Sequence, residues 1–82
     1  MARILVAEDD ENVRAFVTRA LEMSGHEVID ASDGGLALEI ANEHNGNFDL
    51  LVSDIKMPVM DGIGLALAIG AQYPAMTILL MI

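Results

Sequence analysis

The stretch Leu50-Leu51-Val52-Ser53-Asp54-Ile55-Lys56-Met57-Pro58-Val59-Met60-Asp61-Gly62 decides how this chain folds. It opens as a short apolar run, which is typical of a strand buried in a parallel sheet. The run ends at Asp54 and passes into a loop with Pro58 and an Asp61-Gly62 turn. In open α/β sheets, ligands and chemistry lie beyond the carboxyl ends of the strands. Asp54 is therefore the first candidate for a functional residue.

A second stretch ends in carboxylates in the same way. Residues 3–7 are predicted to form a strand, and they run directly into the acidic sequence Glu8-Asp9-Asp10-Glu11. Residues 48–53 form the strand that ends at Asp54. Two parallel strands would therefore bring acidic side chains to one edge of one sheet.

The rest of the chain alternates between helix and strand patterns. Apolar residues recur at helical spacing over 13–21 and 36–41, so both segments are predicted to be helices with one apolar face. Residues 62–71 form a third helix despite three glycines. Residues 27–31 and 76–82 are strands, and the last is continuously apolar, as expected for a central parallel strand. The order β-α-β-α-β-α-β predicts an α/β fold with a doubly wound parallel sheet and right-handed crossovers.

Composition excludes several classes of protein. The chain has 82 residues, which corresponds to a single domain over 1–82. Its net charge of −9 leaves no basic stripe for nucleic acid. The absence of cysteine excludes disulfides, thiolate catalysis and cysteine-bound zinc.

A membrane segment is the alternative for the uncharged residues 62–82, which are numerous enough to span a bilayer. Pro74 would break such a helix, and Gln72 would be costly in lipid. An apolar helix followed by a buried strand is the better interpretation. The acidic residues after residue 7 interrupt the N-terminal apolar run, which is therefore no signal peptide. A cytoplasmic protein without membrane contact is expected.

Carboxylates gathered at one edge suggest a metal site. Like charges at short range raise one another's pKa or require a cation. Oxygen ligands favour a hard ion, and Mg²⁺ commonly binds through one or two carboxylates and a phosphate. A Mg²⁺ ion held by Asp9, Asp54 and Glu8 or Asp10 would suit phosphoryl transfer to an aspartate. The alternative is that these residues are independent helix-start and turn acids.

The residues that carry this site also resemble a known family. Glu8-Asp9 after the first strand and the D-x-x-M-P-x-M-D-G pattern over 54–62 resemble the receiver domain of bacterial two-component response regulators. The pattern is highly specific, and the resemblance covers the whole chain. It implies the flavodoxin-like, CheY-like receiver fold.

The resemblance implies a role for each site residue. Asp54 would accept a phosphoryl group from a phosphohistidine of a sensor histidine kinase or histidine phosphotransferase. Asp9 would bind Mg²⁺ directly, Glu8 would support the ion through water, and the Lys56 carbonyl would be a third protein ligand. The Lys56 side chain could instead pair with the acids, and Asp61 is expected to cap a helix. The helix that starts beside the acids would dock the partner.

The chain departs from the family at its end. Receivers continue into a further helix, strand and helix, which carry a Thr or Ser after the fourth strand and a later lysine. Neither residue is present, so the chain is expected to be a fragment, a partial receiver. Strand 76–82 would then expose an edge, which predicts homo-oligomers through this strand or through exchanged elements.

Three other functions are alternatives to a phosphoacceptor. The first is a receiver-like interaction module that is never phosphorylated. A haloacid-dehalogenase-type phosphatase needs a second aspartate two residues after the first, where this chain has Lys56. A dinucleotide-binding domain needs a glycine-rich loop after residue 7, which is acidic here. The favoured hypothesis is a phosphoacceptor that is no enzyme beyond catalysing its own phosphorylation and dephosphorylation.

Overall fold

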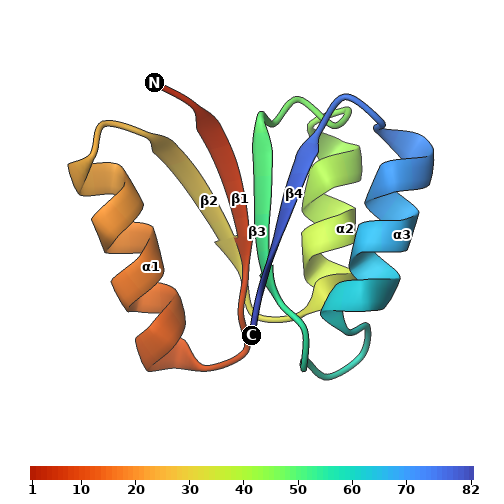
Figure 1. Cartoon of the computed structure of the whole chain (residues 1–82), viewed down its shortest axis with the longest axis horizontal. Helices are drawn as coiled ribbons and strands as arrows, with labels where there is room; N and C mark the ends of the chain where they lie inside the picture. The colour runs from red at the N-terminus through yellow and green to blue at the C-terminus, as the bar shows by residue number, and fades with distance from the viewer.

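A four-stranded, fully parallel sheet forms the centre of the computed structural model, which describes all 82 residues (Figure 1). The strands lie in the order β2-β1-β3-β4. Each strand is joined to the next by a helix, which confirms the expected β-α-β-α-β-α-β order and α/β class. The elements are β1 (Arg3–Ala7), α1 (Glu11–Met23), β2 (Glu27–Ala31), α2 (Gly34–Glu43), β3 (Leu50–Asp54), α3 (Gly62–Gln72) and β4 (Thr77–Met81).

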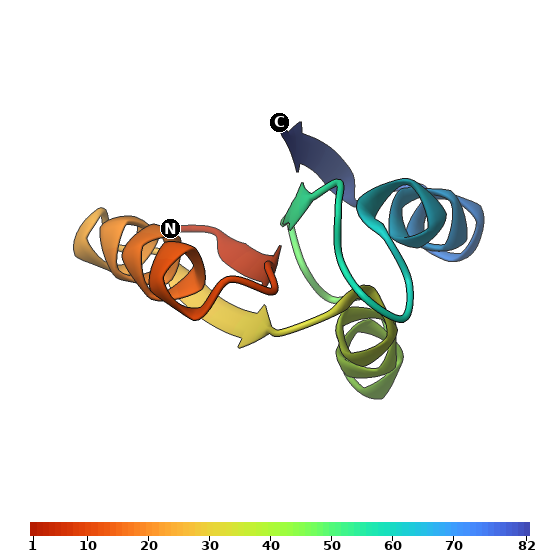
Figure 2. The same cartoon turned by 90° about the horizontal axis from the view of Figure 1, so that it is seen from below.

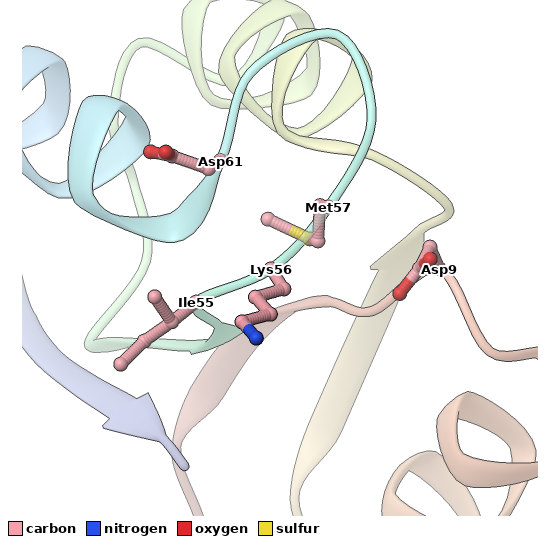
Figure 3. Close-up of a pocket in the computed structure, with 5 residues that line it drawn as sticks. All are labelled: Asp9, Ile55, Lys56, Met57 and Asp61. Carbon is pink, nitrogen blue, oxygen red and sulfur yellow. The ribbon is translucent and has the colours of Figure 1, made fainter.

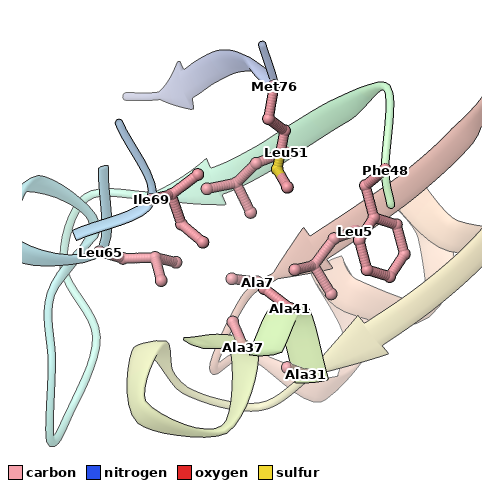
Figure 4. Close-up of a cluster of buried hydrophobic side chains, with 10 residues drawn as sticks. All are labelled: Leu5, Ala7, Ala31, Ala37, Ala41, Phe48, Leu51, Leu65, Ile69 and Met76. Carbon is pink, nitrogen blue, oxygen red and sulfur yellow. The ribbon is translucent and has the colours of Figure 1, made fainter. Parts of the chain in front are cut away.

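Helices cover the two faces of the sheet unequally. Helix α1 lies alone on one face, and α2 and α3 lie together on the other (Figures 1 and 2). The main core fills the space between the sheet and this helix pair (Figure 4). Its ten buried residues are Leu5, Ala7, Ala31, Ala37, Ala41, Phe48, Leu51, Leu65, Ile69 and Met76.

Helix α1 is less buried than its sequence pattern indicates. Val17 and Leu21 pack against a small cluster of Ile4, Val6 and Val52. Phe16, however, is 74% exposed, and no residue of α1 is fully buried. The apolar face predicted over 13–21 is therefore only partly covered by the sheet. A single helix contacts the sheet along a narrow strip, so the rest of its apolar stripe faces solvent.

Aspartates start all three helices at the same edge of the sheet. Asp10 accepts hydrogen bonds from the backbone N–H groups of residues 12 and 13. Asp33 caps α2 through the N–H of residue 36, and Asp61 caps α3 through that of residue 64. The caps satisfy N–H groups that have no partner within the helix. The expected capping role of Asp61 is confirmed.

Strand β4 pairs with β3 only and forms one edge of the sheet. The exposed edge expected for strand 76–82 is therefore confirmed, although its continuously apolar sequence is typical of a central strand. Ile78 packs against the main core and Met81 against a smaller cluster on the other face, and Leu79 is 54% exposed. Self-association through this strand stays a prediction. No helix is both long and apolar enough to cross a bilayer.

Replacing Leu51 by alanine should lower the free energy of unfolding by about 2–5 kcal/mol, because this fully buried side chain fills the main core. Leu67, in α3, is 71% exposed and provides the matched control. Leu67→Ala should change stability by only about 0.5 kcal/mol. Urea denaturation followed by circular dichroism measures the free energy of unfolding of both variants. Equal losses of stability would contradict the burial of Leu51 in the main core.

Candidate metal centre

The register of β1 and β3 brings the acidic residues together. The two strands are neighbours in the sheet, and Ala7 lies opposite Ser53. Glu8 and Asp9 follow Ala7, and Asp54 follows Ser53, so all three leave the sheet at the same level. One carboxylate oxygen from each of Glu8, Asp9 and Asp54 lies within 4.8 Å of the other two. These residues were predicted to lie at one edge of the sheet, and the structure confirms that position.

Glu8 is the buried member of this cluster, only 4% exposed. Its backbone N–H donates to the Ala31 carbonyl of β2 at 3.0 Å, and its carboxylate accepts a hydrogen bond from the Asp10 N–H at 2.9 Å. Burial raises the pKa of Glu8, and the neighbouring carboxyl groups of Asp9 and Asp54 raise it further, while the Asp10 N–H opposes the shift. The fold therefore holds a carboxylate where its negative charge is unfavourable without a cation.

Arg14 fixes the backbone at the start of this acidic turn. Its guanidinium donates to the Glu8 carbonyl oxygen at 2.9 Å and pairs with Asp30 of β2 at 3.4 Å. Arg14 was not among the residues predicted for this site. The available signal was its place one helical turn after the Asp10 cap, where a long side chain can reach back over the end of β1.

Two cavities flank the phosphoacceptor candidate. An open cavity of about 600 Å³ is lined by Asp9, Ile55, Lys56, Met57 and Asp61 (Figure 3). A smaller one of about 320 Å³ is lined by Asp54, Ile55, Lys56 and Ile82. Asp54 is partly exposed, and its Oδ1 accepts a hydrogen bond from the Ile55 N–H at 2.8 Å. A small anion can therefore reach the Asp54 carboxylate from solvent.

The loop after Asp54 carries the other predicted ligand. Lys56 lines both cavities, and its ammonium group forms no ion pair. The alternative, an ion pair between the Lys56 side chain and the acidic cluster, is therefore not observed. The loop is closed at its base by the Gly62 N–H, which donates to the Ile55 carbonyl at 2.7 Å. A Cβ on Gly62 would overlap the Asp54 carbonyl oxygen, so only glycine fits there.

The donor set fits a hard divalent cation. The cluster offers carboxylate oxygens only, and its close spacing is costly unless positive charge offsets the repulsion. Oxygen ligands from few side chains, with open space for water and a phosphate, suit Mg²⁺. Asp10 and Asp61 do not belong to the cluster, because both are occupied as helix caps.

This fold and its acidic edge define a flavodoxin-like α/β domain with carboxylates beyond the ends of its two central strands. The sequence model of the response regulator receiver domain matches residues 4–82. The chain therefore belongs to the receiver domain family of two-component response regulators, as the resemblance indicated.

Individual relatives agree with this assignment. The response regulator receiver protein CpdR of Brucella abortus is 48% identical over 66 residues, which cover 80% of this chain and 53% of CpdR. The transcriptional regulatory protein PrrA of Mycobacterium tuberculosis is 45% identical over 70 residues, which cover 85% of this chain and 29% of PrrA. The chain thus spans about half or less of these relatives.

Two solved structures of TrrA, a response regulator of Thermotoga maritima, are similar to this chain at 35% identity. TrrA in complex with Mg²⁺-BeF superposes with a TM-score of 0.87, covering 98% of this chain and 68% of TrrA. TrrA in complex with the histidine kinase ThkA gives a TM-score of 0.85, covering 98% and 67%.

Replacing Glu8 by glutamine should stabilise the metal-free protein at pH 7, because glutamine keeps an acceptor for the Asp10 N–H without a buried charge. The pKa of Glu8 is higher in the folded than in the unfolded state, so deprotonation destabilises the fold. The gain should therefore shrink below the ordinary pKa of 4.5, where Glu8 is protonated in both states.

Urea denaturation in EDTA at pH 7 and pH 4 measures this difference. The control is Glu39→Gln on the exposed surface of α2, which should show no comparable pH-dependent gain. A Glu8→Gln variant no more stable than the parent at pH 7 would contradict the electrostatic account of the site.

Proposed function

We propose that this chain is a phosphoacceptor that takes a phosphoryl group on Asp54 from a phosphohistidine of a sensor histidine kinase or histidine phosphotransferase. The observation that carries the proposal is the meeting of Glu8, Asp9 and Asp54 within 4.8 Å beside two open cavities. Asp54 is half-buried at the end of a central strand and lines the smaller of the two cavities. The related TrrA was solved with Mg²⁺-BeF, which supports the same chemistry here.

The transfer balances without any further reactant. A carboxylate oxygen of Asp54 attacks phosphorus, and the bond between phosphorus and the imidazole nitrogen breaks. The electron pair of that bond stays on the imidazole, which takes up a proton from solvent. The product is an aspartyl phosphate, and attack of water on its phosphorus returns the carboxylate and free phosphate. The chain would in this way catalyse only its own phosphorylation and dephosphorylation.

A Mg²⁺ ion would be held by Asp9, Asp54, the Lys56 carbonyl and, through water, Glu8. When bound, it would neutralise the negative charge that gathers on the phosphoryl oxygens. The chain's own contribution is orientation: Arg14 holds the Glu8 carbonyl, and the Gly62–Ile55 hydrogen bond closes the loop that carries Lys56. Burial of Glu8 keeps one carboxylate facing the site in a fixed position.

Helix α1 is the proposed docking surface for the phosphodonor. It begins one residue after its cap Asp10, next to Asp9, so a protein bound along it can reach the acidic site. Its exposed stripe includes Val13, 42% exposed, and Phe16, 74% exposed. Unpartnered apolar side chains of this kind suit a protein interface. TrrA was solved with the kinase ThkA, which supports a kinase partner, and a cytoplasmic location stays a prediction.

Asp54→Asn should abolish covalent labelling by acetyl phosphate, because the amide is not a nucleophile for this transfer. The parent chain should take up label only with Mg²⁺ present, as read by intact-protein mass spectrometry. The matched control is Asp49→Asn, just before the same strand, where asparagine can still accept the Arg3 N–H. Label retained in Asp54→Asn would contradict the proposal. A parent chain that takes no label would favour the unphosphorylated interaction module.

Phe16→Ala should slow phosphoryl transfer from a histidine kinase by about tenfold while leaving labelling by acetyl phosphate unchanged, because the small donor needs no docking surface. Met23, at the far end of α1, is 78% exposed and gives the control variant Met23→Ala. Stopped-flow or quenched transfer from a phosphorylated kinase measures both. An equal loss with both donors would show that Phe16 acts on the fold instead of on docking.

A further inference from the structure

The loop between β3 and α3 has a strained tip. The Met60 N–H donates to the Pro58 carbonyl at 2.8 Å, which closes a three-residue γ-turn around Val59. The φ angle of Val59 is +69°, and its side chain is 88% exposed. A γ-turn with positive φ is rare and strained, above all for a β-branched residue. An exposed side chain gains nothing there by packing, so another contact must hold the turn.

That contact is made by the start of α2. Gly34 is buried, and a Cβ placed on it would overlap the Met60 carbonyl oxygen. A Cβ on Gly35 would lie 3.0 Å from the Cγ1 of Val59. The backbone of the loop tip therefore sits directly on the backbone of the first turn of α2, as the path of the loop in Figure 2 shows.

Helix α2 makes a rigid support for the loop tip. Asp33 caps it through the Leu36 N–H at 2.7 Å, and Ala37 and Ala41 are fully buried in the main core. The other end of the loop is fixed to β3 by the hydrogen bond from Gly62 to Ile55. Lys56 lies between these two fixed points, next to the acidic cluster.

We propose that Gly34 is a positioning residue for the metal centre: its contact with the Met60 carbonyl holds the 55–61 loop so that the Lys56 carbonyl faces the ion. The proposal rests on the proposed function and goes beyond it, because it assigns part of the metal affinity to a residue of α2. Gly35 plays a weaker part, since a Cβ there would meet side chains and not the backbone: the Val59 Cγ1 at 3.0 Å and the Asp33 Oδ1 at 3.2 Å.

Gly34→Ala should weaken Mg²⁺ binding by about tenfold, the size of effect expected when a group that orients a metal ligand is lost. Isothermal titration of the full chain measures this. An independent measurement uses the metal-free protein: amide NMR signals of residues 55–62 should move, and the Gly62 N–H should exchange faster. Signals of α1 should stay in place.

Two further variants distinguish the backbone contact of Gly34, which is proposed to position the loop, from the side-chain contact of Gly35. Gly35→Ala should weaken Mg²⁺ binding less, and Val59→Ala should restore it in the double variant, because the clash is with the removed methyl groups. Val59→Ala should not rescue Gly34→Ala, whose clash is with backbone. Gly70→Ala is the matched control, since nothing lies within 4 Å of a Cβ there.

A folded Gly34→Ala protein with unchanged Mg²⁺ affinity and unmoved loop signals would overturn the proposal. If Gly34→Ala does not fold, failure of Val59→Ala to rescue Gly35→Ala would overturn it instead. A parent chain that binds no Mg²⁺ and takes no label refutes the proposed function. The NMR and exchange measurements on metal-free protein would still decide whether Gly34 holds the loop.

Discussion

The repulsion among Glu8, Asp9 and Asp54 is the constraint on which this site depends. The fold brings them within 4.8 Å because β1 and β3 are parallel neighbours that end at the same level. Burial first, and then the neighbouring carboxyl groups of Asp9 and Asp54, raise the pKa of Glu8, so its negative charge is unfavourable in this cluster. The arrangement therefore lowers the stability of the fold, and a bound cation would offset the loss.

The two faces of the sheet differ in how many side chains they bury. The main core lies under α2 and α3, where ten side chains are buried, including Leu51 and Leu65. The face under α1 holds only three buried residues. The exposed part of α1, with Phe16 at its middle, adjoins the acidic edge, so the less buried face is also the face available to a protein partner.

Aspartates at the carboxyl edge have separate tasks that are easily confused in the sequence. Asp10, Asp33 and Asp61 satisfy backbone N–H groups at helix starts, whereas Asp9 and Asp54 cap no helix and belong to the acidic cluster. The hydrogen-bond partners distinguish them. Consecutive residues such as Asp9 and Asp10 thus differ in role because one points back over the sheet edge and the other into the first turn of α1.

The sequence alone determined the order of elements, the α/β class, the family and the acids that form the cluster. Apolar runs ending at Ala7 and Asp54 carry this information locally, because a parallel sheet aligns the carboxyl ends of its strands. The sequence did not determine that Val13 and Phe16 are exposed, since their exposure depends on what packs beside α1. The Arg14 bond to the Glu8 carbonyl joins α1 to the end of β1, and the Gly34 contact with Met60 joins α2 to the loop after β3. Only the tertiary structure decided these two contacts between elements.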